Sequence, residues 1–412
     1  MARKTNDASP LASPAIGTAA HDLISPCHER LLRAADPAGP PTALPLALAF
    51  SGGGFRATLA ALGVLRFLAQ TGLLSDVRYV SSVSGGSVAG GLFAHHYGQL
   101  EEHGFSRDAV DDILVRPFVG RISTDSLTWA VVRRLWRAAG PRTTRTDLLA
   151  DVFDDWFFRQ LRLEKLSPAC RFVFNAANLT TGVRFAFERD RIGDWVCGWA
   201  RTAGSIRLAQ AAAASAAVPG AFAPFTVRGV TFPCAGGQAP RLLDGGAYDN
   251  SALEAVDDLD GTLLIALNAG GIFQTGPYGH IPVVRELARA NALLYRQTTS
   301  LRMREMVDRF KAWEEAARNH VPSPPWGRQG VLFGLATTFP PGRLPPEWTD
   351  QAGRPEHPDW RVPMAQYRTS FGRFPPEVCR RLIYRGWWLT GASLAAYHPG
   401  AVTGKAPDWI DF

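Results

Sequence analysis

The sequence is poor in the features that mark membrane-spanning, secreted and metal-binding proteins. It has no run of about 18 strongly apolar, uncharged residues, which a transmembrane helix requires. Its N-terminus lacks the continuous apolar stretch of a signal peptide. The few cysteines are Cys27, Cys170, Cys197, Cys234 and Cys379. Their scattered spacing fits neither a metal site nor a disulfide framework. We therefore expect buried free thiols in a cytoplasmic protein whose membrane contact, if any, is peripheral.

Long runs of like charge are also missing. Lys and Arg exceed Asp and Glu by 7, but the basic residues are dispersed, and no zinc spacing or RNA-binding aromatic motif accompanies them. The sequence therefore predicts no nucleic-acid binding. The basic excess is compatible with contact to an anionic membrane surface. The oligomeric state is left undetermined.

Apolar runs alternate with helical patterns, which predicts an α/β fold. Strands are expected at residues 44–50, 77–82, 171–177, 183–188, 242–243 and 263–269, and helices at 24–35, 57–71, 86–100, 205–217, 282–319 and 375–396. Residues 321–346 are expected to form a loop and 360–373 an irregular segment. The expected organisation is a loosely ordered lead-in (1–40), a catalytic core (41–275) with a helical insertion (about 101–168), and a helical, proline-rich C-terminal extension (276–412) that packs on the core.

The segment VRYVSSVSGGSVAGGL, residues 77–92, is typical of a strand that turns sharply into a helix, with Ser84 at the corner. This is the nucleophile-elbow arrangement, in which the serine side chain leaves the sheet and the next N–H groups are free. Ser82 stands where the motif G-x-S-x-G has its first glycine. The alternative is a Gly/Ser turn without chemistry.

A glycine-rich loop, Ser51 to Arg56, lies between the preceding strand and helix. Three interpretations compete. It lacks the remaining residues of the dinucleotide and Walker A motifs, which disfavours phosphate binding. It could be a plain turn. It could also supply an oxyanion hole, because adjacent parallel strands bring both loops to the carboxyl edge of the sheet.

A serine nucleophile needs a base, and no histidine carries a strong local signal. His95 and His96 follow Ser84 on its own helix at about 16 Å, which is too far for a hydrogen bond. His280 and His398 remain alternatives. An aspartate can act instead if burial raises its pKa. Asp244, at the exit of a short apolar strand and before two glycines, has that setting, although an ordinary Asp-Gly turn would read the same way.

The insertion contains a basic, aromatic helix with Trp129, Arg133, Arg134, Trp136 and Arg137. Such a helix can dock on a membrane interface. The composition favours the alternative of a solvated helix whose tryptophans pack on the protein body. The insertion as a whole is expected to be a helical addition or lid over the site.

Five stretches resemble the bacterial patatin-like phospholipases and occur in the order found in that family. They are LALAFSGGGFRATLAALGVLRFLAQTGLL (46–74), VRYVSSVSGGSVAGG (77–91), AAAASAAVPGAFAPF (211–225), LLDGGAYDNSALE (242–254) and, more loosely, TSFGRFPPEVCRRLIYRGWWL (369–389). Each motif is weak alone, whereas five in order are specific.

The resemblance implies a three-layer α/β/α fold with a mostly parallel sheet. The implied site residues are Ser84 and Asp244 as a catalytic dyad and Gly52, Gly53, Gly54 and Arg56 at the oxyanion hole. The implied activity is hydrolysis of a lipid acyl ester, of phospholipase A or lysophospholipase type, through an acyl-enzyme and without metal or cofactor. Alternatives are a general carboxylesterase or acyltransferase with the same dyad, or a catalytically silent lipid-binding protein, which the Ser82 departure allows.

Overall fold

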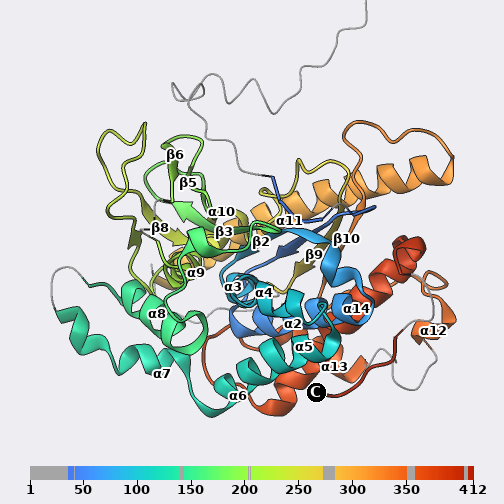
Figure 1. Ribbon diagram of the computed structural model, residues 1–412, viewed down its shortest axis with the longest axis horizontal. Helices are drawn as coiled ribbons and strands as arrows, with labels where there is room; N and C mark the ends of the chain where they lie inside the picture. The colour runs from blue at the N-terminus through green and yellow to red at the C-terminus, as the bar shows by residue number, and fades with distance from the viewer. Residues whose placement is uncertain are drawn as a thin grey trace, which may run out of the picture.

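A computed structural model describes residues 36–40, 42–139, 143–202, 204, 206–271, 284–349, 358–402 and 407–412 (Figure 1). Its strands are β1 (Leu46–Phe50), β2 (Val77–Val83), β3 (Arg171–Asn178), β4 (Arg184–Phe187), β5 (Arg191–Asp194), β6 (Gly198–Arg201), β7 (Phe225–Thr226), β8 (Arg241–Asp244), β9 (Leu263–Asn268) and β10 (Gly330–Gly334). Within these described ranges they form one ten-stranded sheet, with the order β10-β9-β1-β2-β3-β4-β5-β6 and with β8 and β7 branching from β3.

The central strands β10, β9, β1, β2 and β3 all run parallel. Strand β1 lies between β9 and β2, and all five of its residues are buried, as expected for a strand covered on both faces. From β3 outward the pairing is antiparallel, through β4, β5 and β6 and through β8 and β7. Because neighbouring parallel strands end at one edge, the loops after β1 and β2 lie side by side there.

The helices are α2 (Gly54–Gln70), α3 (Gly85–His95), α4 (Tyr97–Glu102), α5 (Arg107–Val110), α6 (Arg116–Thr124), α7 (Leu127–Val132), α8 (Arg145–Phe153), α9 (Leu208–Ser215), α10 (Gly246–Asp249), α11 (Val284–Arg318), α12 (Pro346–Thr349), α13 (Pro358–Gln366) and α14 (Pro376–Tyr397). None of the helices in the described part of the chain is both long and apolar enough to cross a membrane.

Helices cover both faces of the parallel strands (Figure 1). Leu48 and Phe50 of β1 belong to the large core that includes α2, α3 and α14. The alternate residues Ala47 and Ala49 pack on the opposite face, in a smaller core that includes Met306 of α11. The molecule therefore has the predicted α/β fold, with helices on both faces of a central, mostly parallel sheet.

Helices α2 and α14 cross very closely. A Cβ on Gly63 of α2 would lie 2.1 Å from the carbonyl oxygen of Ile383, and one on Gly386 of α14 would lie 2.0 Å from that of Ala60. Glycine at both positions lets the two backbones touch. The C-terminal helix is therefore seated directly on the helix that follows the glycine-rich loop.

The structure differs from the sequence predictions in three places. The expected loop 321–346 contains β10, an edge strand of the central sheet, so a boundary at residue 275 divides one sheet. The segment expected to be irregular, 360–373, begins within α13. The hairpin β5–β6 was not predicted, because its short strands contain glycine and acidic residues, which are uncommon in strands. The helix expected at 24–35 lies outside the described residues.

The cysteine predictions hold in part. Cys170, Cys197 and Cys379 are free and buried, as expected. Cys234 is disulfide-bonded, so the prediction of a free thiol is wrong there. Cys27 lies outside the described residues.

Candidate active site

Ser84 occupies the corner between β2 and α3. Its backbone has φ 53° and ψ −120°, a conformation that non-glycine residues rarely adopt. The side chain is buried, with 5% of its surface exposed. Because strain of this kind costs about 1–3 kcal/mol, surrounding contacts must hold it.

The contacts that hold Ser84 come from Ser215, at the end of α9. The N–H of Ser84 donates to the carbonyl oxygen of Ser215 at 3.1 Å and to its hydroxyl at 3.0 Å. The same carbonyl accepts the N–H of Gly245 at 3.2 Å, and the Ser215 hydroxyl donates to the carbonyl of Asn175 at 2.6 Å. Ser215 thus joins the Ser84 corner to the residue after Asp244. Ser215 belongs to the stretch 211–225, and a single serine in an alanine run is a signal from which it could have been found.

Asp244 ends β8, next to the carboxyl end of β3, and its side chain is hydrogen-bonded to that of Ser84. Burial raises the pKa of Asp244 to about 6, although the hydrogen bonds from Ser84 and from the Gly246 N–H (2.7 Å) oppose this rise. The two residues predicted as a dyad therefore lie in contact. A carboxylate with this pKa is a stronger base than a solvent-exposed aspartate.

The glycine-rich loop lies against the Ser84 corner. A Cβ on Gly52 would lie 2.2 Å from Oδ1 of Asn250 and 3.2 Å from the Cβ of Ser84. A Cβ on Gly85 would lie 2.0 Å from the carbonyl oxygen of Gly54, so the starts of α2 and α3 touch. Two helix N-termini, with their partial positive charges, thus converge beside the Ser84 side chain.

The predicted oxyanion donors are not equivalent. The N–H of Gly52 is already used, because it donates to the carbonyl of Asn250 at 3.0 Å. Gly53 has φ 149° and Gly54 has φ 60°, and no acceptor for either N–H is found among the described residues. Gly53 and Gly54 are therefore the members of the loop with donors to offer.

Arg56 does not fit the oxyanion role. Its guanidinium is buried and donates to the carbonyl oxygens of Ala269 (2.8 and 3.1 Å), Ala365 (3.3 Å) and Tyr367. Burial lowers the pKa of Arg56 to about 10, which leaves it charged at neutral pH. These contacts clamp the start of α2 to the loop after β9 and to the C-terminal end of α13. The structure assigns Arg56 a supporting position behind the loop.

Replacing Arg56 with alanine is expected to lower the free energy of unfolding by about 3 kcal/mol or more, because two buried carbonyls and one partly buried carbonyl lose their donor. Urea denaturation measures this loss. Arg116→Ala, at an exposed ion pair, is the control and should change stability by less than about 0.5 kcal/mol. A loss of kcat in Arg56→Ala with unchanged stability would instead favour a role at the oxyanion.

Ser82, the departure from the elbow motif, is accommodated by polar contacts. Its hydroxyl donates to the carbonyl of Val173 at 3.3 Å and accepts from Ser87 at 3.2 Å. A Cβ on Gly90, one turn further along α3, would lie 3.1 Å from the Ser82 hydroxyl. Strand β2 and helix α3 approach each other closely at this point, so one of the two facing residues must be small. Gly90 of α3 is that residue, which leaves room for Ser82 on β2.

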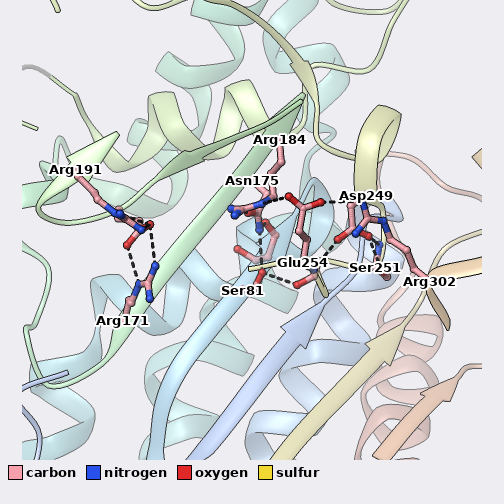
Figure 2. Close-up of polar contacts among 12 residues, drawn as sticks. Ser81, Arg171, Asn175, Arg184, Arg191, Asp249, Ser251, Glu254 and Arg302 are labelled. Carbon is pink, nitrogen blue, oxygen red and sulfur yellow. Dashed lines mark hydrogen bonds and ion pairs between the residues drawn. The ribbon is translucent and has the colours of Figure 1, made fainter. Parts of the chain in front are cut away.

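A polar network supports the elbow from the sheet side (Figure 2). Asn175 of β3 donates to the hydroxyl of Ser81 and to the carbonyl of Ser82, each at 2.9 Å. Arg184 donates to Asn175 at 3.0 Å and to Glu254 at 3.1 Å, and Arg302 of α11 donates to Glu254 at 2.8 Å. The network connects β2, β3, β4, the segment after Asp244 and α11. It ties β2, the strand that precedes Ser84, to β3, to which β8 and Asp244 are also paired.

Tyr295 of α11 is a further residue near the dyad that sequence reasoning missed. Its hydroxyl lies 3.3 Å from the position of a Cβ on Gly270, and its ring lies 3.5 Å from that on Gly246. Burial and the nearby Asp244 carboxylate raise the pKa of Tyr295. Tyr295 lies in α11, which the sequence analysis assigned to the C-terminal extension, and the residues around it form no motif that indicates a site.

The histidines considered as bases lie elsewhere or are not described. His398 shares a hydrogen bond of 3.1 Å with the carbonyl of Gly330, at the start of β10. The start of a parallel strand is at the edge opposite to Ser84. His95 packs its ring against Phe158, and His280 lies outside the described residues.

Comparison with solved structures bears on the fold. Human GIVD cytosolic phospholipase A2 is similar, with 15% identity, a TM-score of 0.51, and coverage of 87% of this chain and 62% of that one. The same protein in complex with methyl gamma-linolenyl fluorophosphonate gives 17% identity, a TM-score of 0.49, and 87% and 59% coverage. VipD from Legionella pneumophila is 14% identical, with a TM-score of 0.35 and coverage of 87% of this chain and 68% of that one. At these identities the likeness concerns the fold alone, and this chain spans less than two thirds of the human protein.

No curated protein sequence matches the chain. The family described as patatin-like phospholipase matches residues 48–257. That range begins in β1, contains the glycine-rich loop and the Ser84 corner, and ends after Asp244, so it includes every predicted site residue. More than half of the chain is matched, and the protein belongs to the patatin-like phospholipase family.

Proposed function

We propose that the protein is a serine hydrolase of lipid acyl esters, of phospholipase A or lysophospholipase type. The observation that carries the proposal is the contact between Ser84, at a strained strand-to-helix corner, and the buried carboxyl of Asp244. Family membership supports a lipid substrate. The whole activity and its substrates are inferred from these two observations.

In the proposed reaction, Asp244 accepts the Ser84 proton as Oγ forms a bond with the acyl carbon. The negative oxygen of the tetrahedral intermediate is held by the N–H groups of Gly53 and Gly54, beside the N-terminus of α3. The ester C–O bond breaks, and the leaving alkoxide takes the proton from Asp244. Water then attacks the acyl-enzyme and gives a proton to Asp244. As the bond between the acyl carbon and Ser84 Oγ breaks, Asp244 returns this proton to Oγ, which releases the fatty acid and restores Ser84 and the Asp244 carboxylate. These steps need neither a metal nor a cofactor.

A panel of esters tests the proposal. Wild-type protein should release fatty acid from long-chain phospholipid or lysophospholipid, and Ser84→Ala should not. Hydrolysis of short-chain p-nitrophenyl esters alone would favour a general carboxylesterase. Transfer of the acyl group to an added alcohol without free fatty acid would favour an acyltransferase. Lipid binding without turnover would favour the silent lipid-binding alternative.

The sequence predicts a cytoplasmic location, and one feature of the structure bears on that prediction. Disulfides are typical of oxidising compartments, so the disulfide at Cys234 counts against the cytoplasmic location expected from the sequence. Peripheral contact with an anionic membrane does not depend on that location.

A further inference from the structure

An exposed apolar surface lies on α7 and the 3₁₀ turn that follows it, Leu135–Ala139. The exposed fractions are 62% for Trp129, 41% for Val132, 41% for Leu135 and 72% for Trp136. Leu127, Ala130 and Val131 are buried beneath them. We call the four exposed residues the tryptophan surface. The sequence favoured tryptophans packed on the protein body, and that prediction is wrong for both of them.

The stretch of sequence that carries the tryptophan surface is rich in arginine. Residues 113–146 contain seven arginines and one acidic residue, Asp125, in a chain whose total net charge is only +7. Arg133 pairs with Asp125, and Arg134 pairs with Asp155 of the neighbouring segment. Arg137 stacks on Trp136, with its guanidinium 5.3 Å from the ring centre. The surface therefore combines exposed indoles with a local excess of arginine.

The tryptophan surface lies close to the candidate site. The N–H of Thr128 in α7 donates to the carbonyl of Phe371 at 3.3 Å. The adjacent carbonyl, that of Ser370, accepts the N–H of Phe55 at 3.0 Å, directly after the glycine-rich loop. One short segment thus joins α7 to the predicted oxyanion donors.

A second exposed apolar segment approaches the dyad from the neighbouring helix. The carbonyl of Ala217 accepts the N–H of Asp244 at 2.9 Å, and the next residue, Val218, has 42% of its surface exposed. A few residues further, the carbonyl of Ala223 accepts the hydroxyl of Thr146, next to the first residue of α8. Helix α8 follows the tryptophan surface in the chain and packs against α7. Exposed apolar groups are thus connected both to the glycine-rich loop and to Asp244.

We infer that the tryptophan surface and its arginines bind an anionic lipid surface, which brings the dyad to its substrate. The inference rests on the proposed function. Indoles prefer the membrane–water interface, and arginines near an anionic leaflet are attracted to it. A second copy of the chain is a poorer partner, because two surfaces with the same excess of arginine would face each other.

Vesicle co-sedimentation of the Ser84→Ala protein tests this inference without altering the lipid. The protein should bind vesicles of phosphatidylcholine with phosphatidylglycerol, and added salt or omission of phosphatidylglycerol should weaken binding. Arg133→Gln with Arg137→Gln should weaken it about 25-fold, because each arginine contributes about fivefold. Trp129→Ser with Trp136→Ser should also weaken it, because the interfacial affinity depends on buried apolar area.

Matched controls lie on the opposite side of the sheet. Trp326→Ser removes an indole that is 56% exposed, and Lys311→Gln with Arg318→Gln removes two exposed cations of α11. These variants should bind vesicles like the parent. Equal binding by the tryptophan-surface and control variants would overturn the inference. Loss of a concentration-dependent dimer in the Trp129/Trp136 variant, without loss of vesicle binding, would also overturn it.

Turnover assays separate this inference from the proposed function. In the otherwise wild-type protein, the Trp129/Trp136 variant should keep its rate on a water-soluble ester and lose rate on anionic vesicles. Specific vesicle binding without any ester hydrolysis by the wild type would contradict the proposed function and leave the inference standing. Hydrolysis of vesicle lipid at the same rate by wild type and variant would contradict the inference alone.

Discussion

Replacing Ser84 with alanine is expected to lower kcat/KM for an acyl ester by at least about 10⁴-fold, because the nucleophile of the proposed reaction is removed. Labelling by a fluorophosphonate should disappear as well, and intact-mass measurement after labelling reports this directly. Ser75→Ala, at an exposed serine, is the control and should keep full activity and labelling. Undiminished labelling of Ser84→Ala would remove Ser84 from the mechanism.

The strained backbone of Ser84 predicts an effect on stability that substitution of an unstrained surface serine would not have. At φ 53° and ψ −120° a Cβ is strained, whereas glycine adopts this region readily. Ser84→Gly should therefore be more stable than Ser84→Ala by about 1 kcal/mol, although both are inactive. Urea denaturation of the two variants measures the difference. Equal stability would indicate that the corner is not strained in solution.

Replacing Asp244 with asparagine should lower kcat/KM by about 10³-fold or more, because an amide cannot accept the Ser84 proton. The same variant should be more stable than the wild type at pH 7. Burial raises the pKa of the native carboxyl to about 6 from an ordinary value of 3.8, so the ionised form costs the native state up to about 3 kcal/mol. The neutral amide avoids this cost and still accepts the N–H of Gly246.

The raised pKa of Asp244 determines how stability and activity change with pH. A carboxyl whose native pKa is raised stabilises the fold fully below pH 3.8, and this stabilisation is lost as the pH rises towards about 6. The stability advantage of Asp244→Asn should therefore be small at pH 3.5 and reach its full size above pH 6. In the wild type, kcat/KM should fall below about pH 6, because Asp244 must be ionised to act as base. A pH-independent stability difference or rate would contradict this assignment.

The parallel part of the fold could be predicted from the sequence, and Ser84 and Asp244 could be singled out as candidates, because both signals are local. The strands β1 and β9 are almost continuous apolar runs, and β2 is rich in valine with one tyrosine. Ser84 and Asp244 lie at strand ends and are followed by glycines. Such patterns need no knowledge of distant contacts. The same holds for α14, whose apolar face is read from its own periodicity.

The remaining features depend on partners far apart in the chain. Strand β10 is short and is flanked by proline-rich sequence, so only its pairing with β9 identifies it. Arg56 resembles a site residue by position, yet its acceptors are carbonyls more than two hundred residues away. Ser215 and Tyr295 approach Ser84 and Asp244 only through tertiary packing. The lone serine in an alanine run makes Ser215 stand out but does not indicate its contact with Ser84, and Tyr295 has no local signal. Sequence reasoning finds residues with a local motif and misses those whose role is set by tertiary contacts.

The clamp on Arg56 has a consequence for the order in which the protein is synthesised. The carbonyls that receive its guanidinium include those of Ala365 and Tyr367, and Phe55 is held by Ser370. A ribosome makes the dyad first and these acceptors much later. The glycine-rich loop therefore cannot reach its final shape on a nascent chain until residue 370 has been made. Under the proposed function, the oxyanion donors are thus the last part of the site to take shape during synthesis.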